Sequence, residues 1–197
     1  YLAVYSYGAV VLPAIDPEQA IKITEKGIAS NPNEWRLYQH LGYIYWRLKQ
    51  YEKAAEIYDK GSQIPNAPDF MRLMAAQMKN QGGSRETARQ IYEQMLAQST
   101  DTQTKESATL HLLGLDSLEE REVINPVLEK FKQTVGRCPT NWREVFPLLK
   151  SQKTATGKFL RFDSATFSPV DPTNIPYFLN NQNDRCEGVI NNKISKI

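Results

Sequence analysis

The sequence predicts a mostly α-helical protein, with a solenoid of helix-turn-helix repeats over residues 1–117 and a small α+β module with short antiparallel strands over residues 118–197. Three observations predict this class. Small and aromatic residues recur with one period through the first hundred residues. Asn-Pro and Pro-rich breaks separate runs of helical length. After about residue 118 the period is lost, and further along apolar and polar residues alternate as they do in strands.

The period is 34 residues, and four columns keep it in one register. The columns are Gly8, Gly42 and Ala76; Ala20, Ala54 and Ala88; Thr24, Tyr58 and Tyr92; and Gly27, Gly61 and Met95. A period of this length is typical of a helix-turn-helix unit that stacks on its neighbours. We expect the small residues where two helices cross closely, because a larger side chain would push the backbones apart. The aromatic residues would fill the space between helix pairs.

Helix-start signals place the individual helices. Asp16-Pro17 and Asn33-Glu34 combine a capping side chain with an acidic or proline first turn, and Ser84 is a candidate cap after a glycine turn. A seventh helix is expected to cover the open end of the last repeat, as terminal repeats require. The predicted helices span residues 2–12, 17–30, 34–48, 51–63, 68–80, 85–98 and 102–116.

The second unit carries a family resemblance. It reads Tyr38, Leu41, Gly42, Tyr45, Tyr51, Ala54, Tyr58 and Gly61, and closes at Pro65. This set resembles the tetratricopeptide repeat family, whose signature is W-x₂-L-G-x₂-Y…A-x₃-F…P. Tyr38 replaces the Trp, Pro65 falls one residue early, and the third unit is degenerate. The resemblance covers about residues 1–100 and implies a right-handed arc whose first helices line a groove for a segment of another protein.

Helical spacing selects the residues that would line this groove. From the second unit they are Arg36, Gln39, Tyr43, Trp46 and Arg47, and the other units add Tyr5, Ala9, Leu12, Leu73 and Gln77. Tyr43, Trp46 and Arg47 share one side of the helix at spacings of three and four. Tyr, Trp and Arg are the residue types that dominate binding energy at interfaces. Two interpretations of Trp46 stay open: it lines the groove, or it packs against the next repeat or a preceding segment.

The C-terminal half changes character. A helix over residues 118–135 contains Pro126, which predicts a kink or break, and Gly136 is expected to end it. A short helix is predicted over residues 140–150, with Thr140 or Asn141 as its cap. The remaining predicted elements are strands near residues 158–162, 165–167, 175–179 and 187–190, with a polar turn at 180–184.

Cys138 and Cys186 both lie outside the repeats. Two interpretations stay open. They are unrelated thiols, or they form one disulfide that closes the C-terminal unit and indicates an oxidising compartment. No metal site is expected, because two cysteines without histidine neighbours fall short of four ligands.

A second resemblance lies in this half. It rests on Gly136-x-x-Pro139-x-x-Trp142 followed by Asp171-Pro172-x-x-x-Pro176-Tyr177. The pattern resembles the C-terminal module of type II pseudopilins and similar bacterial envelope proteins. Asn174 stands in the Gly place of that pattern, and Asn tolerates the left-handed conformation. The resemblance implies a membrane-anchored envelope protein with its anchor ahead of the repeats. Asp171 and Asn174 leave two alternatives, an Asx turn or a calcium site.

No catalytic cluster is expected. His40 and His111 lie far apart in predicted helices, and Glu119-Glu120 is typical of a solvated helix start. The Gly82-Gly83 turn lacks the Gly-Lys-Ser/Thr ending of a phosphate loop. The formal net charge of +2 does not indicate a nucleic-acid partner. The sequence therefore predicts no catalytic residues, no metal and no cofactor, and so not an enzyme.

The ends of the chain bear on location. The longest apolar run, residues 9–12, is too short to span a bilayer, and no signal peptide is visible. Because the chain begins at Tyr1 and not at Met, we expect it to be processed or truncated. Membrane association through a missing N-terminal anchor therefore stays open.

These observations predict a non-catalytic protein–protein interaction scaffold, a subunit of a bacterial membrane or cell-envelope assembly that is membrane-associated or extracytoplasmic. Its partners would be other proteins of that assembly. One alternative is a structural subunit with an empty groove, which assembles through convex surfaces and through Phe159, Phe162, Phe167 and Phe178. The other is a soluble cytosolic adaptor with transient clients.

Overall fold

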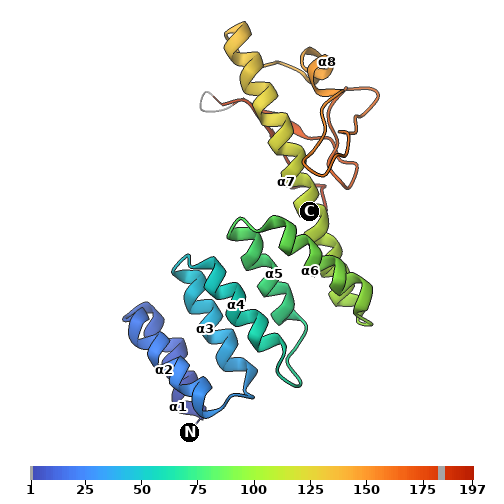
Figure 1. Cartoon of the computed structure of the whole chain (residues 1–197). Helices are drawn as coiled ribbons and strands as arrows, with labels where there is room; N and C mark the ends of the chain where they lie inside the picture. The colour runs from blue at the N-terminus through green and yellow to red at the C-terminus, as the bar shows by residue number, and fades with distance from the viewer. Residues whose placement is uncertain (1, 182–184) are drawn as a thin grey trace. The chain divides into compact units, whose positions relative to one another are not determined.

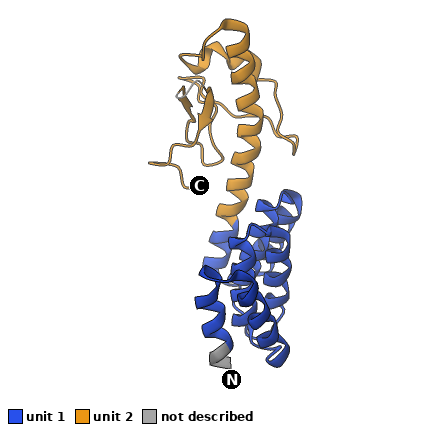
Figure 2. Ribbon diagram, turned by 90° about the vertical axis from the view of Figure 1, so that its left-hand side faces the viewer, with its two compact units in different colours: residues 1–108 blue, residues 109–197 orange. Residues whose placement is uncertain are grey.

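The computed structural model describes residues 2–181 and 185–197, with side chains from residue 5 onward. The chain forms two compact units, unit 1 over residues 1–108 and unit 2 over residues 109–197 (Figure 2). The expected boundary after residue 117 falls inside one helix, α7 (Thr102–Val135), which runs on without a break. Within the described ranges, no helix combines the length and the apolar character needed to cross a membrane.

Unit 1 consists of three helix pairs and the start of α7 (Figure 1). The pairs are α1 (Leu2–Val11) and α2 (Pro17–Ser30), α3 (Trp35–Arg47) and α4 (Tyr51–Ser62), and α5 (Phe70–Gln81) and α6 (Arg85–Gln98). A 3-10 turn, η1 (Leu12–Ala14), joins the first pair. Consecutive helices pack on each other, and α1 also packs on α3. The predicted helical repeats are confirmed, with bounds that differ by no more than two residues.

The start signals work locally in two of the three cases. The Asp16 carboxylate accepts a hydrogen bond from the backbone N–H of Gln19 at 3.0 Å, and Glu34 accepts one from Arg36 at 3.3 Å. Both cap the first turn of a helix and satisfy N–H groups that have no partner inside it. The prediction for Ser84 is wrong. It occupies the N-cap position of α6, but its hydroxyl donates to Glu52 Oε1 at 3.0 Å instead of capping the helix.

The small-residue columns mark the helix crossings. A Cβ atom at Gly42 would lie 2.7 Å from the Tyr58 ring, and one at Gly61 would lie 2.7 Å from Cβ of Tyr38. Both distances are far below van der Waals contact, so neither crossing could accept a side chain without moving apart. The alanine column behaves in the same way: Ala20, Ala54 and Ala88 have no exposed surface.

The aromatic column fills the interior of the pairs. Tyr58 and Tyr92 are 2% and 1% exposed. Burial, with a smaller contribution from Tyr43, raises the pKa of Tyr58 to about 12, and burial also raises the pKa of Tyr92. In the first unit the same column holds Thr24, a shorter residue, whose hydroxyl donates to the backbone carbonyl of Ala20 at 2.6 Å. A polar side chain thus occupies a fully buried position with its hydrogen bond satisfied.

Unit 2 contains most of α7, a 3-10 turn η2 (Trp142–Glu144), the short helix α8 (Phe146–Leu149) and two strands, β1 (Phe178–Asn180) and β2 (Glu187–Val189). The strands pair antiparallel, with Phe178 opposite Val189 and Asn180 opposite Glu187. The predicted α+β module with short antiparallel strands is therefore confirmed. Of the polar turn expected at 180–184, residues 182–184 lie outside the described residues.

The sequence predicted a boundary between two helices near residue 117 and a kink or break at Pro126. Neither break is present, because α7 is one continuous helix through Pro126. A proline inside a helix costs about 3 kcal/mol, since it removes one hydrogen bond and crowds the preceding turn. Ile124 and Leu128 lie on either side of it, and both are fully buried in one core with Trp142 and Tyr177. Burial of these two side chains stabilises the helix across the proline. Helix propensity, which depends on neighbouring residues alone, does not reveal this burial.

Two predicted strands are wrong. Residues 158–162 form only isolated bridges, Lys153 with Phe159 and Phe162 with Pro169. Residues 165–167 form no bridge and lie at a turn. Phe167 has φ 61°, in the left-handed region, which ends any extended run at that point. Prolines in the neighbouring segment lack the N–H that a sheet ladder needs.

Two other elements shift for similar reasons. The strand expected at 175–179 begins only at Phe178, and Pro176 makes an isolated bridge to Val170. The single helix expected over residues 140–150 divides into η2 and α8, and Pro147 lies in the first turn of α8. Asn141 caps η2 by accepting from the N–H of Arg143 at 3.0 Å.

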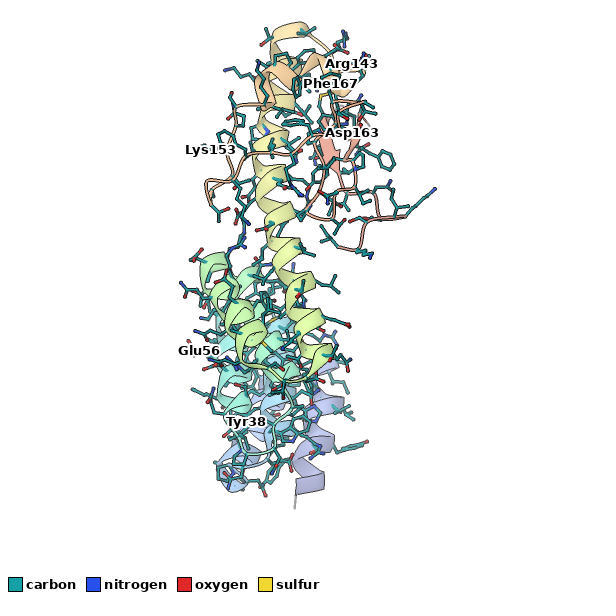
Figure 3. All side chains as sticks on the ribbon, turned by 90° about the vertical axis from the view of Figure 1, so that its right-hand side faces the viewer. Tyr38, Glu56, Arg143, Lys153, Asp163 and Phe167 are labelled. Carbon is teal, nitrogen blue, oxygen red and sulfur yellow. A yellow bond between two sulfur atoms is a disulfide. The ribbon has the colours of Figure 1, made fainter. Side chains whose placement is uncertain are left out.

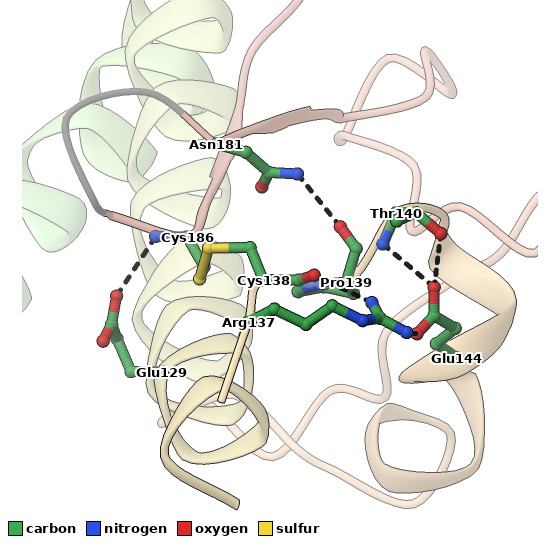
Figure 4. Close-up of a disulfide and its surroundings, with 8 residues drawn as sticks. All are labelled: Glu129, Arg137, Cys138, Pro139, Thr140, Glu144, Asn181 and Cys186. Atoms are coloured by element: carbon green, nitrogen blue, oxygen red, sulfur yellow. Dashed lines mark hydrogen bonds and ion pairs between the residues drawn. A yellow bond between two sulfur atoms is a disulfide. The ribbon is translucent and has the colours of Figure 1, made fainter. Parts of the chain in front are cut away.

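A disulfide joins Cys138 to Cys186, with Cα atoms 5.6 Å apart (Figure 4). It links the segment just after α7 to the start of the final strand, and Cys186 is fully buried in the core of unit 2. The backbone N–H of Cys186 also donates to Glu129 of α7 at 3.1 Å. On the other side, the Arg137 guanidinium lies 2.9 Å from the Glu144 carboxylate. A covalent bond and charged contacts thus hold the same corner.

Buried polar groups hold the rest of unit 2. The Tyr177 hydroxyl donates to Glu120 Oε2 at 2.7 Å, and the Ser117 hydroxyl lies 3.0 Å from the same phenol oxygen. Glu119 and Glu120 are only 4% and 7% exposed, so the interpretation of this pair as a solvated helix start is wrong. Burial raises the pKa of Glu120, although the bond from Tyr177 and the charge of Arg161 act in the opposite direction.

The Asp171 turn takes the Asx form. Its Oδ1 accepts from the backbone N–H groups of Thr173 and Ile175 at 2.8 and 3.0 Å, and its Oδ2 accepts from the Ser195 hydroxyl at 2.5 Å. Asn174 has φ 65°, as the pattern required. Burial acts to raise the pKa of Asp171, but the hydrogen bonds from Ser195 and Thr173 outweigh it and lower that pKa.

Candidate protein-binding face of the helix pairs

Helix α3 separates its side chains into two faces. Leu37, Leu41 and Ile44 recur at helical spacing and are at most 2% exposed, so they form the face that packs against the neighbouring helices. The opposite stripe holds Tyr43 and Trp46, which are 43% and 39% exposed. Large aromatic side chains are thus held on a helix whose position is fixed by packing on its other side.

Tyr43 and Trp46 form a pair on this stripe. Their ring centroids are 5.5 Å apart, and the ring planes are tilted by 39°. This separation lies within the range in which aromatic rings stabilise each other. The pair is therefore a preformed apolar surface with a polar atom at each edge, the Tyr43 hydroxyl and the indole N–H of Trp46. Such a surface loses little conformational entropy when a partner covers it.

Trp46 also connects two helix pairs. Its indole N–H donates to Gln81 Oε1 at 3.2 Å, which links α3 to the end of α5. This contact agrees with the interpretation that Trp46 packs against the next pair. The ring is 39% exposed, and the interpretation that it lines the groove stays a prediction. Gln81 was missed, although the period contains the signal: it lies 34 residues after Arg47, in the same column of the next unit.

The first helices of successive pairs adjoin one another, since α1 contacts α3 and α3 is bonded to α5 through Trp46. We call their shared exposed surface the first-helix face. It comprises Gln39, Tyr43, Trp46 and Arg47 of α3 with Leu73, Gln77 and Gln81 of α5. Arg47 is exposed, whereas Gln39, Leu73 and Gln77 are half-buried. The face combines two aromatic rings, one guanidinium and three amides, which suits hydrogen bonding to a peptide backbone and packing on its side chains.

The structure places four other predicted groove residues elsewhere. Leu12 lies in the 3-10 turn η1. Arg36 lies at the start of α3, where its guanidinium is 3.1 Å from Glu34 and 4.6 Å from the Trp35 ring centroid. The side chain of Tyr5 fills the space above Gly27, so it packs between α1 and α2. Ala9 is 2% exposed and also belongs to the packing of the first pair.

The spacing between pairs is set by contacts away from the face. The Tyr38 side chain fills the space above Gly61, and its hydroxyl donates to the carbonyl of Pro32 at 3.1 Å (Figure 3). At the turns, Lys79 Nζ lies 2.6 Å from Glu52 Oε2, and the hydrogen bond from Lys79 lowers the pKa of that carboxyl. These contacts hold α3 and α5 in register, and with them the two parts of the first-helix face.

The titratable groups that could serve catalysis are divided between the two units. His40 belongs to unit 1 and His111 to unit 2, and burial lowers the pKa of each. Within residues 2–181 and 185–197, no group of three or more His, Cys, Asp and Glu side chains is arranged to hold a metal ion. Glu120 has a raised pKa but is hydrogen-bonded inside the core of unit 2.

Comparison with known proteins identifies one repeat. Residues 36–67 match the tetratricopeptide repeat model, and they cover α3, α4 and the turn that follows. No curated protein matches the chain. The matched segment contains Tyr43 and Trp46, so the aromatic pair lies on a segment similar to tetratricopeptide repeats, which generally mediate protein–protein interaction.

Proposed function

We propose that the protein is a non-catalytic scaffold that binds a segment of another protein along the first-helix face. The observation that carries this proposal is the exposure of the Tyr43–Trp46 pair at 43% and 39% on a helix whose opposite face is buried. Exposed large aromatic residues in contact with each other are uncommon on a surface that meets only water. Tyr, Trp and Arg are also the side chains most enriched among residues that dominate binding energy.

We further propose a bacterial envelope assembly, on the oxidising side of a membrane, as the setting. The Cys138–Cys186 disulfide supports this location, because disulfides persist mainly in oxidising compartments. The likeness of the Asp171 to Tyr177 segment to type II pseudopilin modules supports it as well. On this proposal the partners are other protein subunits of the assembly. The cytosolic adaptor is the competing proposal, and it requires free thiols in the native protein.

A site-specific photo-crosslink tests the face directly. A photo-reactive phenylalanine analogue is placed at Tyr43 in cells that make the protein, and in a matched control at Leu96, which is 37% exposed on α6. We expect a discrete adduct from position 43 and none of the same mass from position 96. The adduct should weaken when Trp46→Ala and Arg47→Ala are added, because they remove the neighbouring contacts. Equal adducts from both positions would refute the binding face.

A second candidate function is supported by unit 2. Phe159 and Phe178 are 58% and 54% exposed, so they can take part in assembly through this unit. Phe162 and Phe167 cannot contribute equally, because each packs edge-on against Phe146 with ring centroids 5.0 Å apart. If Phe159→Ser and Phe178→Ser abolished assembly while Trp46→Ala left it intact, the structural-subunit function would replace the scaffold.

A further inference from the structure

Unit 2 has an apolar groove that is lined by the last turns of α7 and by the α8 segment. We call it the α7–α8 groove, and its lining residues are Val127, Lys130, Phe131, Thr134, Val135, Leu148 and Gln152. Figure 1 labels the two helices. The α7 members recur at helical spacing, so one continuous stripe of the helix forms the floor. Val135 of α7 and Leu148 of α8 both line the groove, and their side chains are 49% and 48% exposed.

The dimensions of the groove favour side chains of a helix over a small molecule. Its volume is about 270 Å³, below the roughly 300–1,000 Å³ of small-molecule sites. The stripe from Val127 to Val135 is about 12 Å long at 1.5 Å per residue. This length matches two turns of a partner helix, which would present two or three apolar side chains at spacings of three and four.

The chain segment that forms the groove carries more positive than negative residues. Residues 127–153 contain six Lys or Arg and two Glu, although the whole chain has a formal charge of only +2. Both glutamates have partners: Glu129 accepts a hydrogen bond from the backbone N–H of Cys186, and Glu144 forms an ion pair with Arg137. Lys130, which lines the groove, is exposed and forms no ion pair with any residue that the structure describes. An apolar lining that contains an unpaired lysine complements an amphipathic segment that carries carboxylates.

We propose that the α7–α8 groove binds an acidic amphipathic helix of a partner protein. The apolar side chains of that helix would enter between Val135 and Leu148, and a carboxylate on its flank would pair with Lys130. This contact lies in unit 2 and does not depend on the first-helix face. It would give the scaffold a second, independent point of attachment, which raises the overall affinity for an assembly that offers both segments.

Two other occupants fit less well. A lipid surface is contacted by apolar side chains that protrude, whereas these line a recess. In a symmetric dimer formed through this groove, each surface would face its own copy, and Lys130 would meet a lysine instead of a carboxylate. Both occupants therefore lack the charge or shape complementarity that an acidic helix has.

A panel of labelled synthetic helices tests the proposal by fluorescence anisotropy on the full chain. Each peptide is about four turns long, and its leucines follow one of several spacings of three and four. Every spacing is made with glutamates and, as its matched partner, with lysines on the flanks. We expect at least one glutamate peptide to bind about tenfold more tightly than its lysine partner. Leu148→Asp should weaken that binding by about tenfold or more, and Lys130→Glu should reverse the preference for charge.

Three controls make the result specific. Phe178→Ser alters a similarly exposed side chain on β1, and Trp46→Ala alters the first-helix face, so each should leave the peptide affinity unchanged within about twofold. Circular dichroism reports whether each variant is folded. Lys130→Glu changes only an exposed charge, so it keeps the test valid if Leu148→Asp does not fold.

Four outcomes would overturn the proposal. The first is equal binding of the glutamate and lysine peptides at every spacing. The second is peptide binding that changes neither with Leu148→Asp nor with Lys130→Glu. The third is Leu148-dependent binding to anionic lipid vesicles without peptide binding, which would indicate a membrane. The fourth is a dimer in sedimentation experiments that Leu148→Asp dissociates. Loss of the Tyr43 crosslink with peptide binding intact would remove only the function proposed for unit 1.

Discussion

In unit 1 each helix packs against its neighbour in the chain, whereas the core of unit 2 joins residues that are distant in sequence. The contacts of unit 1 repeat the same crossing, with Gly42 under Tyr58 and Gly61 under Tyr38. Unit 2 brings together Ile124, Trp142, Tyr177 and Cys186, and much of the chain between them has no regular secondary structure. A repeat can therefore depend on close packing alone, while unit 2 adds a covalent link and buried hydrogen bonds.

The disulfide should produce the largest difference between the units. Reduction, or Cys138→Ser with Cys186→Ser, removes a link across 48 residues and should lower the free energy of unfolding of unit 2 by about 4 kcal/mol. Unit 1 has no cysteine and should unfold as before. Urea titration in a Trp35→Phe and Trp46→Phe background, where Trp142 is the one tryptophan, followed by fluorescence and by helical circular dichroism, separates the two transitions. Equal shifts in both would show that the units do not unfold independently.

Overpacking a crossing should have the next largest effect, confined to unit 1. Gly42→Leu forces a side chain against the Tyr58 ring and should destabilise unit 1 by about 2 kcal/mol or more. The matched control is Gly114→Ala in α7, where the nearest atom to an added Cβ, in Ile197, is 3.6 Å away. That change should stabilise the helix by about 0.5–1 kcal/mol. Thermal unfolding of both variants shows whether each change raises or lowers stability. If both changes destabilised the protein, the close helix crossing at Gly42 would not explain the loss.

Tyr177→Phe tests the hydrogen bonds of unit 2. It removes the donor to Glu120 at 2.7 Å and leaves a buried carboxyl with fewer partners. The expected cost is about 1–3 kcal/mol, measured by chemical unfolding. Tyr7→Phe in unit 1 removes the same hydroxyl from a side chain that is 72% exposed, and it should change stability by less than about 0.5 kcal/mol. Similar costs for the two changes would mean that the Glu120 contact contributes nothing.

The smallest effect should be the pH dependence contributed by Glu120. Burial raises the pKa of this carboxyl in the folded protein, so folding favours its protonated form. Its contribution to stability is complete below the pKa of the unfolded chain and is lost as the pH rises through the folded pKa. Glu120→Gln keeps an acceptor for Tyr177 without ionising, so it should raise the unfolding temperature of unit 2 near neutral pH but not near pH 4. A variant that is less stable than the native protein at neutral pH would contradict the assigned direction.

The same contrast explains what the sequence predicted. Every helix of unit 1 was found, because capping residues and the 34-residue period are local signals that occur more than once. Continuity of α7 through Pro126 was not found, because the burial of Ile124 and Leu128 depends on residues far along the chain. The expected strand ending at Phe167 failed for a related reason, since nothing in its neighbours predicts a left-handed phenylalanine.

The candidate site divides in the same way. Tyr43 and Trp46 were found from helical spacing within one helix, and Gln81 could have been found from the period. Tyr5 was assigned to the groove because spacing within α1 does not reveal the close approach of Gly27 in α2. The α7–α8 groove could not be predicted, because it exists only once Leu148 is brought beside Val135.

The disulfide has a consequence for protease digestion. Its two cysteines enclose residues 139–185, so cleavage of any peptide bond between them leaves both fragments attached. A nicked chain therefore migrates as one species without reductant and as two with it. Limited proteolysis of this protein therefore reveals cuts in unit 1 without reductant, whereas cuts within the enclosed segment become visible only after the disulfide is reduced.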